Sequence, residues 1–238
     1  MKQITCGKLA LHWLTPSTLV SEAELEQGVH PSEWREAQNW QAKTRRDEFL
    51  RSRWLLRRLT GYQGILGKTP AGAPVWPPAS VGSLTHKSGF IGLALLPSSD
   101  WLSIGIDAED PARMQLAFAP RLCLPAEEAL LRKLADGDLE HQRFLLTVLF
   151  SFKEALFKTL FPLGEIMFYC HDAEITGLDQ QSGQITVCLR RDVAPVAPTG
   201  LVLTGSYRSL DSDGRTFVLT CIGIERTVSG GTGRDNCG

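Results

Sequence analysis

Apolar residues recur with two different periods along the chain, which predicts a mixture of helices and strands. Helical spacing covers residues 31–59 with one break, residues 126–135 and, most strongly, residues 141–160, which Pro162 is expected to close. Strand-like runs are expected at residues 81–96 (two strands around a turn), 101–107, 173–178, 184–190, 201–208 and 216–225. The last two flank Asp213-Gly214, a hairpin signal.

The segments between these runs lack a regular pattern. Residues 68–78 hold four prolines and are expected to form a rigid loop. Residues 112–125 are apolar without a clear helix or strand period, and residues 227–238 are rich in glycine, serine and threonine. We expect an irregular apolar segment in the first case and a disordered tail in the second.

Composition narrows the class of protein. The chain has 238 residues, 43% of them apolar, and a formal net charge of −1, which is ordinary for a globular protein and does not suggest a nucleic-acid binder. Residues 35–58 are the exception, with eight basic and three acidic side chains, and predict a local anion site. No run of apolar residues is long enough to span a membrane.

The start of the chain and the cysteines bear on location. Residues 1–16 contain no continuous apolar stretch of the signal-peptide kind. The six cysteines are scattered without a C-x-x-C pair, which argues against a zinc site and favours free thiols. We therefore expect a cytoplasmic protein.

Three carboxylates are the candidate reactive groups. Asp107 and Glu109 stand at i and i+2 at the end of a strand-like run, so their side chains point the same way. Glu154 lies on the polar stripe of the strongest helix, with Lys153 beside it and Lys158 one turn further on. Carboxylates converging beside lysines suit a divalent cation that is bound together with a phosphate ligand.

These segments resemble the 4′-phosphopantetheinyl transferases of the Sfp type, closest to the branch associated with enterobactin synthase. The resemblance covers roughly residues 45–160. It rests on five motifs in the family's order, which together are far more specific than any one alone. They are Phe49-Leu50-Arg51-Ser52-Arg53 with Arg57, Gly72-Ala73-Pro74-Val75-Trp76-Pro77, Gly82-Ser83-Leu84-Thr85-His86, Gly105-Ile106-Asp107-Ala108-Glu109 and Phe150-Ser151-Phe152-Lys153-Glu154-Ala155 with Lys158.

The resemblance implies a reaction and a fold. The phosphopantetheine arm of coenzyme A would move to a serine of an apo acyl or peptidyl carrier protein, with magnesium, releasing 3′,5′-ADP. The fold would be α/β (α+β), with two pseudo-symmetric half-domains and the active site at their interface. We divide the chain into residues 1–105 (coenzyme A phosphate binding), residues 106–226 (metal binding and catalysis) and the tail, and expect a monomer. A short internal echo, Ile104-Gly105-Ile106-Asp107 and Ile222-Gly223-Ile224-Glu225, agrees with two similar halves.

The resemblance also implies residue roles. Asp107, Glu109 and Glu154 would bind magnesium, and Glu154 would act as the base for the incoming serine, directly or through water. Lys158 would hold the pyrophosphate and take part in catalysis. The remaining predicted coenzyme A contacts are Arg46, Arg53, Arg57, Thr85, His86 and Lys153. Ala73 replaces a lysine that relatives often carry, so Lys68 or Lys87 would have to supply that contact.

Two other functions remain open from the sequence. One is a non-catalytic module of the same fold that binds coenzyme A or a nucleotide, and the presence of all three carboxylates and Lys158 disfavours it. The other is a metal-dependent phosphohydrolase, for which the sequence offers no second metal site. A carrier protein is a small acidic helical bundle, so its docking surface should offer apolar and basic side chains. Residues 113–124 fit that description, although a loop that covers the core would have the same composition.

Overall fold

The N-terminal part of the chain forms a four-stranded antiparallel sheet. The computed structural model describes residues 1–15, 17–18, 20–87 and 89–226. The order of the first sheet is β1-β2-β4-β3, with β1 (Lys2–Cys6), β2 (Leu9–Leu14), β3 (Ser80–Lys87) and β4 (Phe90–Pro97). Residues 2–14 were not expected to be strands. The sequence does contain the alternation typical of a strand. Leu9, Leu11 and Trp13 are buried and alternate with half-buried residues along β2.

The second sheet has five antiparallel strands in the order β5-β9-β8-β7-β6. Its strands are β5 (Trp101–Glu109), β6 (Ala173–Asp179), β7 (Gln184–Leu189), β8 (Val202–Ser212) and β9 (Arg215–Glu225). All five were predicted from the sequence, with ends that differ by a few residues. Two antiparallel sheets with helices confirm the mixed α and β fold class.

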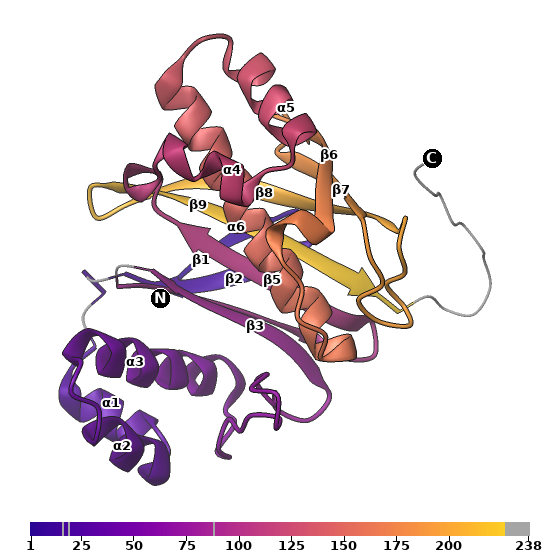
Figure 1. Ribbon diagram of the computed structural model, residues 1–238. Helices are drawn as coiled ribbons and strands as arrows, with labels where there is room; N and C mark the ends of the chain where they lie inside the picture. Colours follow the sequence, from indigo (N-terminus) through magenta and orange to yellow (C-terminus); the bar gives the residue numbers. More distant parts are fainter. Residues whose placement is uncertain (16, 19, 88, 227–238) are drawn as a thin grey trace.

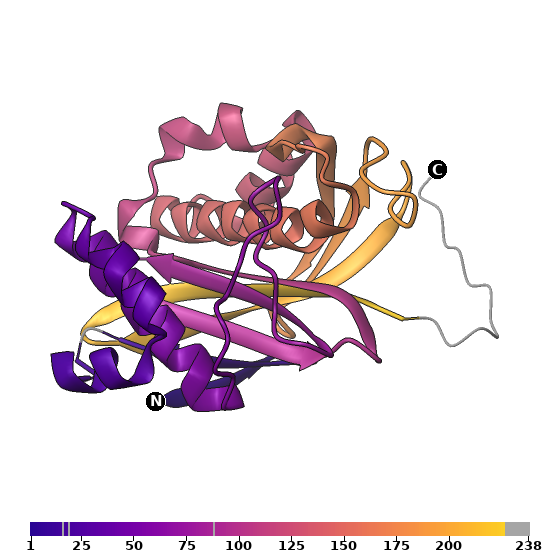
Figure 2. The same ribbon diagram turned by 90° about the horizontal axis from the view of Figure 1, so that it is seen from below.

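The helices cover the sheets in two groups (Figure 1). The N-terminal group is α1 (Glu22–Gly28), α2 (Pro31–Gln38) and α3 (Lys43–Thr60), and α3 packs against β2 and β4 of the first sheet. The second group contains α4 (Ala119–Leu122), α5 (Pro125–Ala135) and α6 (Leu139–Gly164), and α6 lies along β5 and β9. Short 3₁₀ turns occupy Pro111–Arg113, Leu116–Phe118 and Cys170–Asp172. Figure 2 shows α6 lying across one face of the second sheet.

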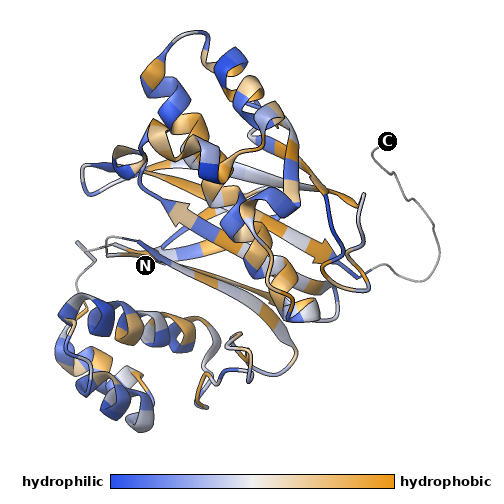
Figure 3. Cartoon of the chain, in the orientation of Figure 1, coloured by the Kyte–Doolittle hydropathy of each residue, from blue (hydrophilic) through white to orange (hydrophobic). Residues whose placement is uncertain are grey.

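The long helix α6 is the centre of the larger core. Its predicted apolar stripe is fully buried against the second sheet, and it comprises Leu145, Val148, Leu149, Phe152 and Leu156. Figure 3 shows the outer helices alternating between hydrophilic and hydrophobic residues, as expected for helices with one face in water. Pro162 was expected to close α6, but it lies inside the last turn and the helix ends at Gly164.

Gly105 allows α6 to lie directly on β5. A β-carbon at this position would sit 1.9 Å from the Ala155 carbonyl oxygen and 2.3 Å from Thr159 Oγ1. Any side chain would therefore push the helix off the strand. This contact brings the helix that carries Glu154 and Lys158 against the strand that carries Asp107 and Glu109.

The two sheets meet where β3 runs beside β5. The Ser83 hydroxyl accepts a hydrogen bond from the Ile106 backbone N–H at 3.0 Å, and the Thr85 hydroxyl accepts one from Ala108 N–H at 3.2 Å. The boundary that we placed between residues 105 and 106 falls inside β5, so the division into half-domains stays a prediction.

Several other expectations concern the ends of the chain and the cysteines. Residues 227–238, the expected disordered tail, lie outside the described residues. Cys6, Cys123, Cys170 and Cys221 are free thiols, as expected. Cys188 is not among these free thiols, and Cys237 lies outside the described residues. In the described part of the chain no helix has the length and apolar character needed to cross a membrane.

Candidate active site

Asp107 lies at the centre of a buried polar network between β3, β5 and α6. Its Oδ1 accepts hydrogen bonds from Thr85 Oγ1 at 3.0 Å and from the ammonium of Lys158 at 2.7 Å. Its Oδ2 accepts one from Ser151 Oγ at 3.0 Å, and Ser151 also contacts Thr220 at 2.9 Å. The carboxylate is therefore oriented by donors from two elements, β3 and α6. The sequence predicted Asp107 and Lys158 but not the contact between them, and it missed Ser151 and Thr220 as partners.

Glu109 forms a second ion pair two residues further along β5. Its carboxylate lies 2.6 Å and 2.9 Å from the Lys87 ammonium, which β3 presents from the neighbouring sheet. Burial, together with the nearby Asp107 and Glu154 carboxylates, raises the pKa of Glu109, and Lys87 partly offsets this rise. Lys87 was considered from the sequence only as a substitute phosphate contact.

Glu154 is half-buried on the face of α6 that meets β5. Desolvation and the Asp107 carboxylate raise its pKa, while Lys158 and Lys87 lower it. A carboxyl group with a raised pKa is a better proton acceptor at neutral pH than an ordinary glutamate. The Asp107 charge contributes to the raised pKa of both Glu109 and Glu154, and the Glu154 charge contributes to that of Glu109, so the three predicted carboxylates are electrostatic neighbours.

The carboxylates do not form a complete metal cage by themselves. Within the described residues, no group of three or more His, Cys, Asp and Glu side chains is arranged to hold a metal ion. Magnesium is commonly held by one or two carboxylates and completed by substrate phosphates and water, so a full protein cage is not required. Burial first, and the neighbouring carboxylates second, raise the pKa of Glu109 and Glu154, and a divalent cation beside them would favour their charged forms. The donor set therefore fits magnesium that is bound together with a pyrophosphate.

Two openings flank the carboxylates. The first is a cleft of about 370 Å³ between α6, β3 and the proline-rich loop, lined by Lys158, Phe157, Phe161, Trp76 and Ala73 among others. The second is a cavity of about 280 Å³ lined by Glu109 and Lys87 and by Met114, Phe118, Arg121 and Leu122. Asp107 is connected to the first opening through its ion pair with Lys158, which lines that cleft. Glu109 itself lines the second opening.

Thr85 and His86 are adjacent on β3 and have different environments. Thr85 is buried, and its hydroxyl bridges Asp107 and the Ala108 N–H, so its visible role is to orient the carboxylate. The His86 side chain is 54% exposed, and its Nδ1 lies 3.3 Å from Glu48 of α3. His86 therefore remains accessible to a phosphate, whereas Thr85 reaches the site through Asp107.

The predicted arginines are not gathered at one anion site. Arg53 and Arg57 are buried and share the Glu33 carboxylate, at 3.4 Å and 2.7 Å. Arg57 also donates to the Gly64 carbonyl at 2.6 Å. Burial lowers the pKa of Arg53, and Glu33 partly offsets this effect. Arg46 is half-buried, with Asp47 3.7 Å away. Both arginines thus hold Glu33, which gives them a structural role, and their predicted contacts with a phosphate stay a prediction.

Lys153 requires a correction. Its side chain is almost completely buried, and its ammonium donates to Glu127 Oε2 at 2.7 Å, Cys170 O at 2.7 Å and Leu122 O at 3.0 Å. An ammonium has only three protons, and all three are used here. The expected contact between Lys153 and coenzyme A is therefore replaced by a structural role. Glu127, its partner, was not identified from the sequence.

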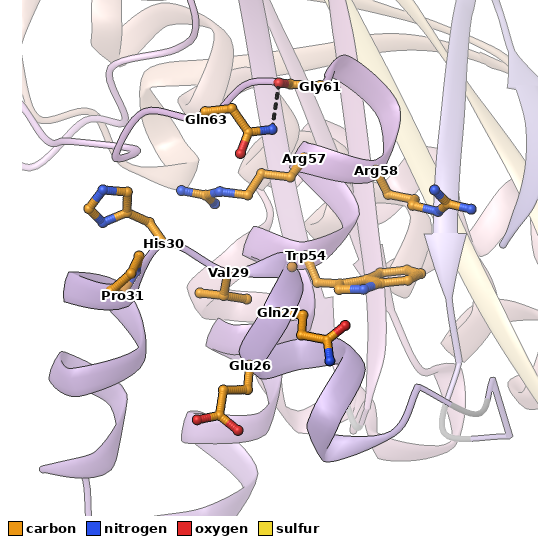
Figure 4. A pocket seen from close by; sticks show the side chains of 11 residues that line it. Glu26, Gln27, Val29, His30, Pro31, Trp54, Arg57, Arg58, Gly61 and Gln63 are labelled. Atoms are coloured by element: carbon orange, nitrogen blue, oxygen red, sulfur yellow. Dashed lines mark hydrogen bonds between the residues drawn. The ribbon is translucent and has the colours of Figure 1, made fainter.

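A larger cavity of about 480 Å³ lies at the C-terminal end of α3 (Figure 4). Its lining includes Trp54, Arg57 and Arg58 from α3, with His30 and Glu26 from the preceding segments. It contains none of the three carboxylates and not Lys158. It is therefore separate from the candidate reaction centre.

Comparisons with known proteins identify the family of this chain. A sequence profile of the 4′-phosphopantetheinyl transferase superfamily matches residues 103–208, which include the three carboxylates and Lys158. A profile of the 4′-phosphopantetheinyl transferase N-terminal domain matches residues 35–95. The 4′-phosphopantetheinyl transferase PptT of Mycobacterium tuberculosis is 32% identical over 186 residues, which cover 75% of this chain and 78% of that protein. The chain belongs to the 4′-phosphopantetheinyl transferase superfamily.

Other similarities within this superfamily are partial. The 4′-phosphopantetheinyl transferase Svp of Streptomyces mobaraensis is 37% identical over 155 residues, which cover 64% of this chain but only 60% of that protein. The holo-[acyl-carrier-protein] synthase of Thermotoga maritima, known from a crystal structure, is 22% identical with a TM-score of 0.35 and covers 50% of this chain and 61% of its own. That structural likeness is too weak to support an argument about this fold.

Proposed function

We propose that this chain transfers the 4′-phosphopantetheine arm of coenzyme A to a serine hydroxyl of an apo acyl or peptidyl carrier protein, releasing 3′,5′-ADP. The supporting observation is the position of Asp107, Glu109 and Glu154 between two openings, with a lysine on each side. Such a site can take a charged pyrophosphate donor from one side and an acceptor from the other. Family membership supports the same reaction.

We propose that the cleft beside Lys158 receives coenzyme A. Its walls combine the aromatic rings of Trp76, Phe157 and Phe161 with the Lys158 ammonium, so they suit a chain that is apolar along its length and anionic at one end. His86 would contact a further phosphate from the exposed end of β3. Ala73 also lines this cleft, so the lysine found there in relatives would have faced the same ligand, and Lys158 supplies the positive charge instead.

Magnesium would be held by Asp107, Glu109 and Glu154 together with the pyrophosphate, and it would neutralise charge on the phosphates that react. Lys158 would hold a pyrophosphate oxygen, and Thr85 and Ser151 keep the Asp107 carboxylate in place. Glu154 would accept the serine proton, directly or through a water. The serine oxygen then forms a bond to the phosphorus nearer to pantetheine, and the bond from that phosphorus to the bridging oxygen breaks, so that 3′,5′-ADP leaves.

We propose that the carrier docks at the cavity beside Glu109. Phe118 is 40% exposed at this cavity, and Arg113 and Arg121 give its rim a positive charge. An acidic carrier helix would complement this rim and place its serine beside the carboxylates. Because all these residues come from one chain, we also propose that the enzyme works as a monomer. The free thiols and the use of coenzyme A support a cytoplasmic location.

The test is whether release of 3′,5′-ADP requires both substrates. The full chain is incubated with magnesium and coenzyme A, with or without an apo carrier, and the products are separated by chromatography. Release only in the presence of the carrier supports the transferase. Cleavage of coenzyme A without a carrier would indicate a phosphohydrolase, and binding without cleavage in either case would indicate a non-catalytic module.

A further inference from the structure

A fully buried ion pair lies directly behind the reactive face of α6. Lys153 and Glu127 are 2.7 Å apart, and their side chains are 1% and 0% exposed. Besides Lys153, Glu127 accepts the backbone N–H of Leu124 at 2.7 Å and that of Ile175 at 2.7 Å. Both charged groups are thus fully hydrogen-bonded, which is the condition under which a buried pair is tolerated.

The pair connects α6 to the segment that lines the second cavity. Lys153 donates to the Leu122 carbonyl, and Glu127 accepts from Leu124 N–H, so both neighbours of Cys123 are held. Leu122 lines the cavity beside Glu109 together with Met114, Phe118 and Arg121. Lys153 also precedes Glu154 in the sequence. One ammonium therefore links the proposed base, through the helix backbone, to the wall of the proposed carrier site.

Breaking this link should affect the two substrates differently. Among the described residues, the side-chain hydrogen bonds of Lys153 and Glu127 go to Leu122, Leu124, Cys170 and Ile175 and not to Phe157, Lys158 or Trp76, which line the coenzyme A cleft. The cavity beside Glu109, by contrast, is walled by residues 114–122, whose C-terminal end is fixed by the pair.

We propose that Lys153 is a positioning residue that, with Glu127, holds residues 113–124 in register with the carboxylates and thereby sets recognition of the carrier rather than of coenzyme A. This inference rests on the proposed function. It assigns to the lysine of the Phe152-Lys153-Glu154 sequence a different task from that of Lys158, which faces the cleft.

The test uses the double variant Lys153→Met/Glu127→Gln, which removes both buried charges and leaves neither one unpaired. The matched control is Arg132→Met/Glu128→Gln, which removes an ion pair of 3.4 Å between exposed Arg132 and half-buried Glu128 on α5, the helix that also carries Glu127. Both proteins are compared with the wild type in three measurements. These are the KM for an apo carrier, the Kd for coenzyme A by calorimetry, and hydrogen–deuterium exchange over residues 113–124.

The double variant should show a KM for the carrier raised about tenfold, the scale of one interface contact. Its Kd for coenzyme A should stay within twofold of the wild type, and exchange over residues 113–124 should be faster. The control should match the wild type throughout. An unchanged KM for the carrier in a folded double variant would overturn the proposal. Equal weakening of coenzyme A binding would also overturn it and return Lys153 to the donor site.

A second variant covers the case in which the double variant does not fold. Leu122→Ala keeps the ion pair but truncates the wall that the pair holds, and it should raise the KM for the carrier without changing the Kd for coenzyme A. No effect of Leu122→Ala would contradict the proposal. If the wild-type chain modifies no carrier at all, the proposed function fails and this inference fails with it. If the wild type is active and only the KM prediction fails, the proposed function stands without it.

Discussion

The Lys158 ammonium lies 2.7 Å from Oδ1 of Asp107, across the contact between α6 and β5. The lysine also donates to the Ile106 carbonyl at 3.2 Å. Its charge compensates a carboxylate that is otherwise buried beside two further carboxylates. A bound cation would take over this compensation, and the ammonium would then be available for a phosphate oxygen. Lys158 would therefore exchange Asp107 for a phosphate oxygen when the substrate and the cation bind.

The first prediction concerns this lysine. Lys158→Met keeps the length of the side chain but removes the charge, so it should lower kcat/KM by about a hundredfold, as for loss of one oxyanion-stabilising donor. Lys133→Met, on the exposed side of α5, is the control and should be near wild type. Steady-state kinetics with saturating carrier would measure both. A Lys158 variant with wild-type kcat/KM would remove this residue from the pyrophosphate site.

Glu154→Gln should separate activity from stability. The substitution keeps the size of the side chain but removes a charge that burial and Asp107 already disfavour, so transfer should be nearly abolished. The melting temperature without magnesium should rise by about 2 °C, the scale of a small gain in a domain of this size. Calorimetric melting beside transfer assays would test this. Loss of activity with a lowered melting temperature would indicate a structural glutamate instead.

The raised pKa values of Glu109 and Glu154 predict a pH dependence with a definite sign. Between the ordinary carboxyl pKa and the raised value, the folded state binds more protons than the unfolded state. This contribution to stability is therefore present at low pH and is lost as pH rises through that window. Magnesium should accordingly raise the melting temperature more at pH 7 than at pH 5. Asp107→Ala should reduce this gain, and an equal effect of magnesium at both pH values would contradict the assignment.

The proximity of the candidate site residues could be predicted from the sequence better than their partners could. Asp107, Glu109, Glu154 and Lys158 could be found because carboxylates at i and i+2 on a strand and residues at i and i+4 on a helix must share a face. The same rule places Lys153 about 100° around the helix from Glu154, away from Lys158, but the resemblance assigned both lysines to coenzyme A. Only the fold shows that the Lys153 ammonium binds the carboxylate of Glu127, which is 26 residues away in the chain.

Most other differences between the sequence predictions and the structure arise from partners that are distant in the chain. Arg53 and Arg57 fall on one helical face, as predicted, but the sequence does not show that Glu33 of α2 lies against that face. The β1–β2 hairpin was missed because its signal is short and the turn is marked only by Gly7, at φ +56°. Residues 112–125 have no period because they fold as 3₁₀ turns and the four-residue helix α4.

The arginines lead to a prediction that compares two donors. Arg46→Ala should raise the KM for coenzyme A while leaving that for dephospho-coenzyme A unchanged, if Arg46 contacts the 3′-phosphate. Arg53→Ala should instead lower the melting temperature, because it removes one of the two arginines that compensate the buried Glu33 charge. Kinetics with both donors and thermal melts would decide. An Arg53 variant that melts normally but loses affinity only for coenzyme A would restore this arginine to the phosphate site.

The docking surface can be tested separately from the donor site. Phe118→Ala and Arg121→Glu should each raise the KM for an acidic carrier by roughly tenfold, because one removes an exposed apolar anchor and the other reverses a rim charge. The Kd for coenzyme A should not change. Calorimetry with coenzyme A alone, beside carrier titrations, gives both values. If both ligands weaken together, or if the variants melt much earlier, the segment covers the core and is not a docking surface.

Mass spectrometry of apo carrier proteins is the most direct test of the proposed transfer. The full chain is incubated with coenzyme A and magnesium and with carriers from fatty-acid, siderophore, peptide and polyketide synthesis, beside the same carriers with the acceptor serine replaced by alanine. We predict the phosphopantetheine mass increment on the serine of at least one carrier, none on the alanine forms, and none with Glu154→Gln. Absence of the increment on every carrier, with folded chain that binds coenzyme A, would contradict the account.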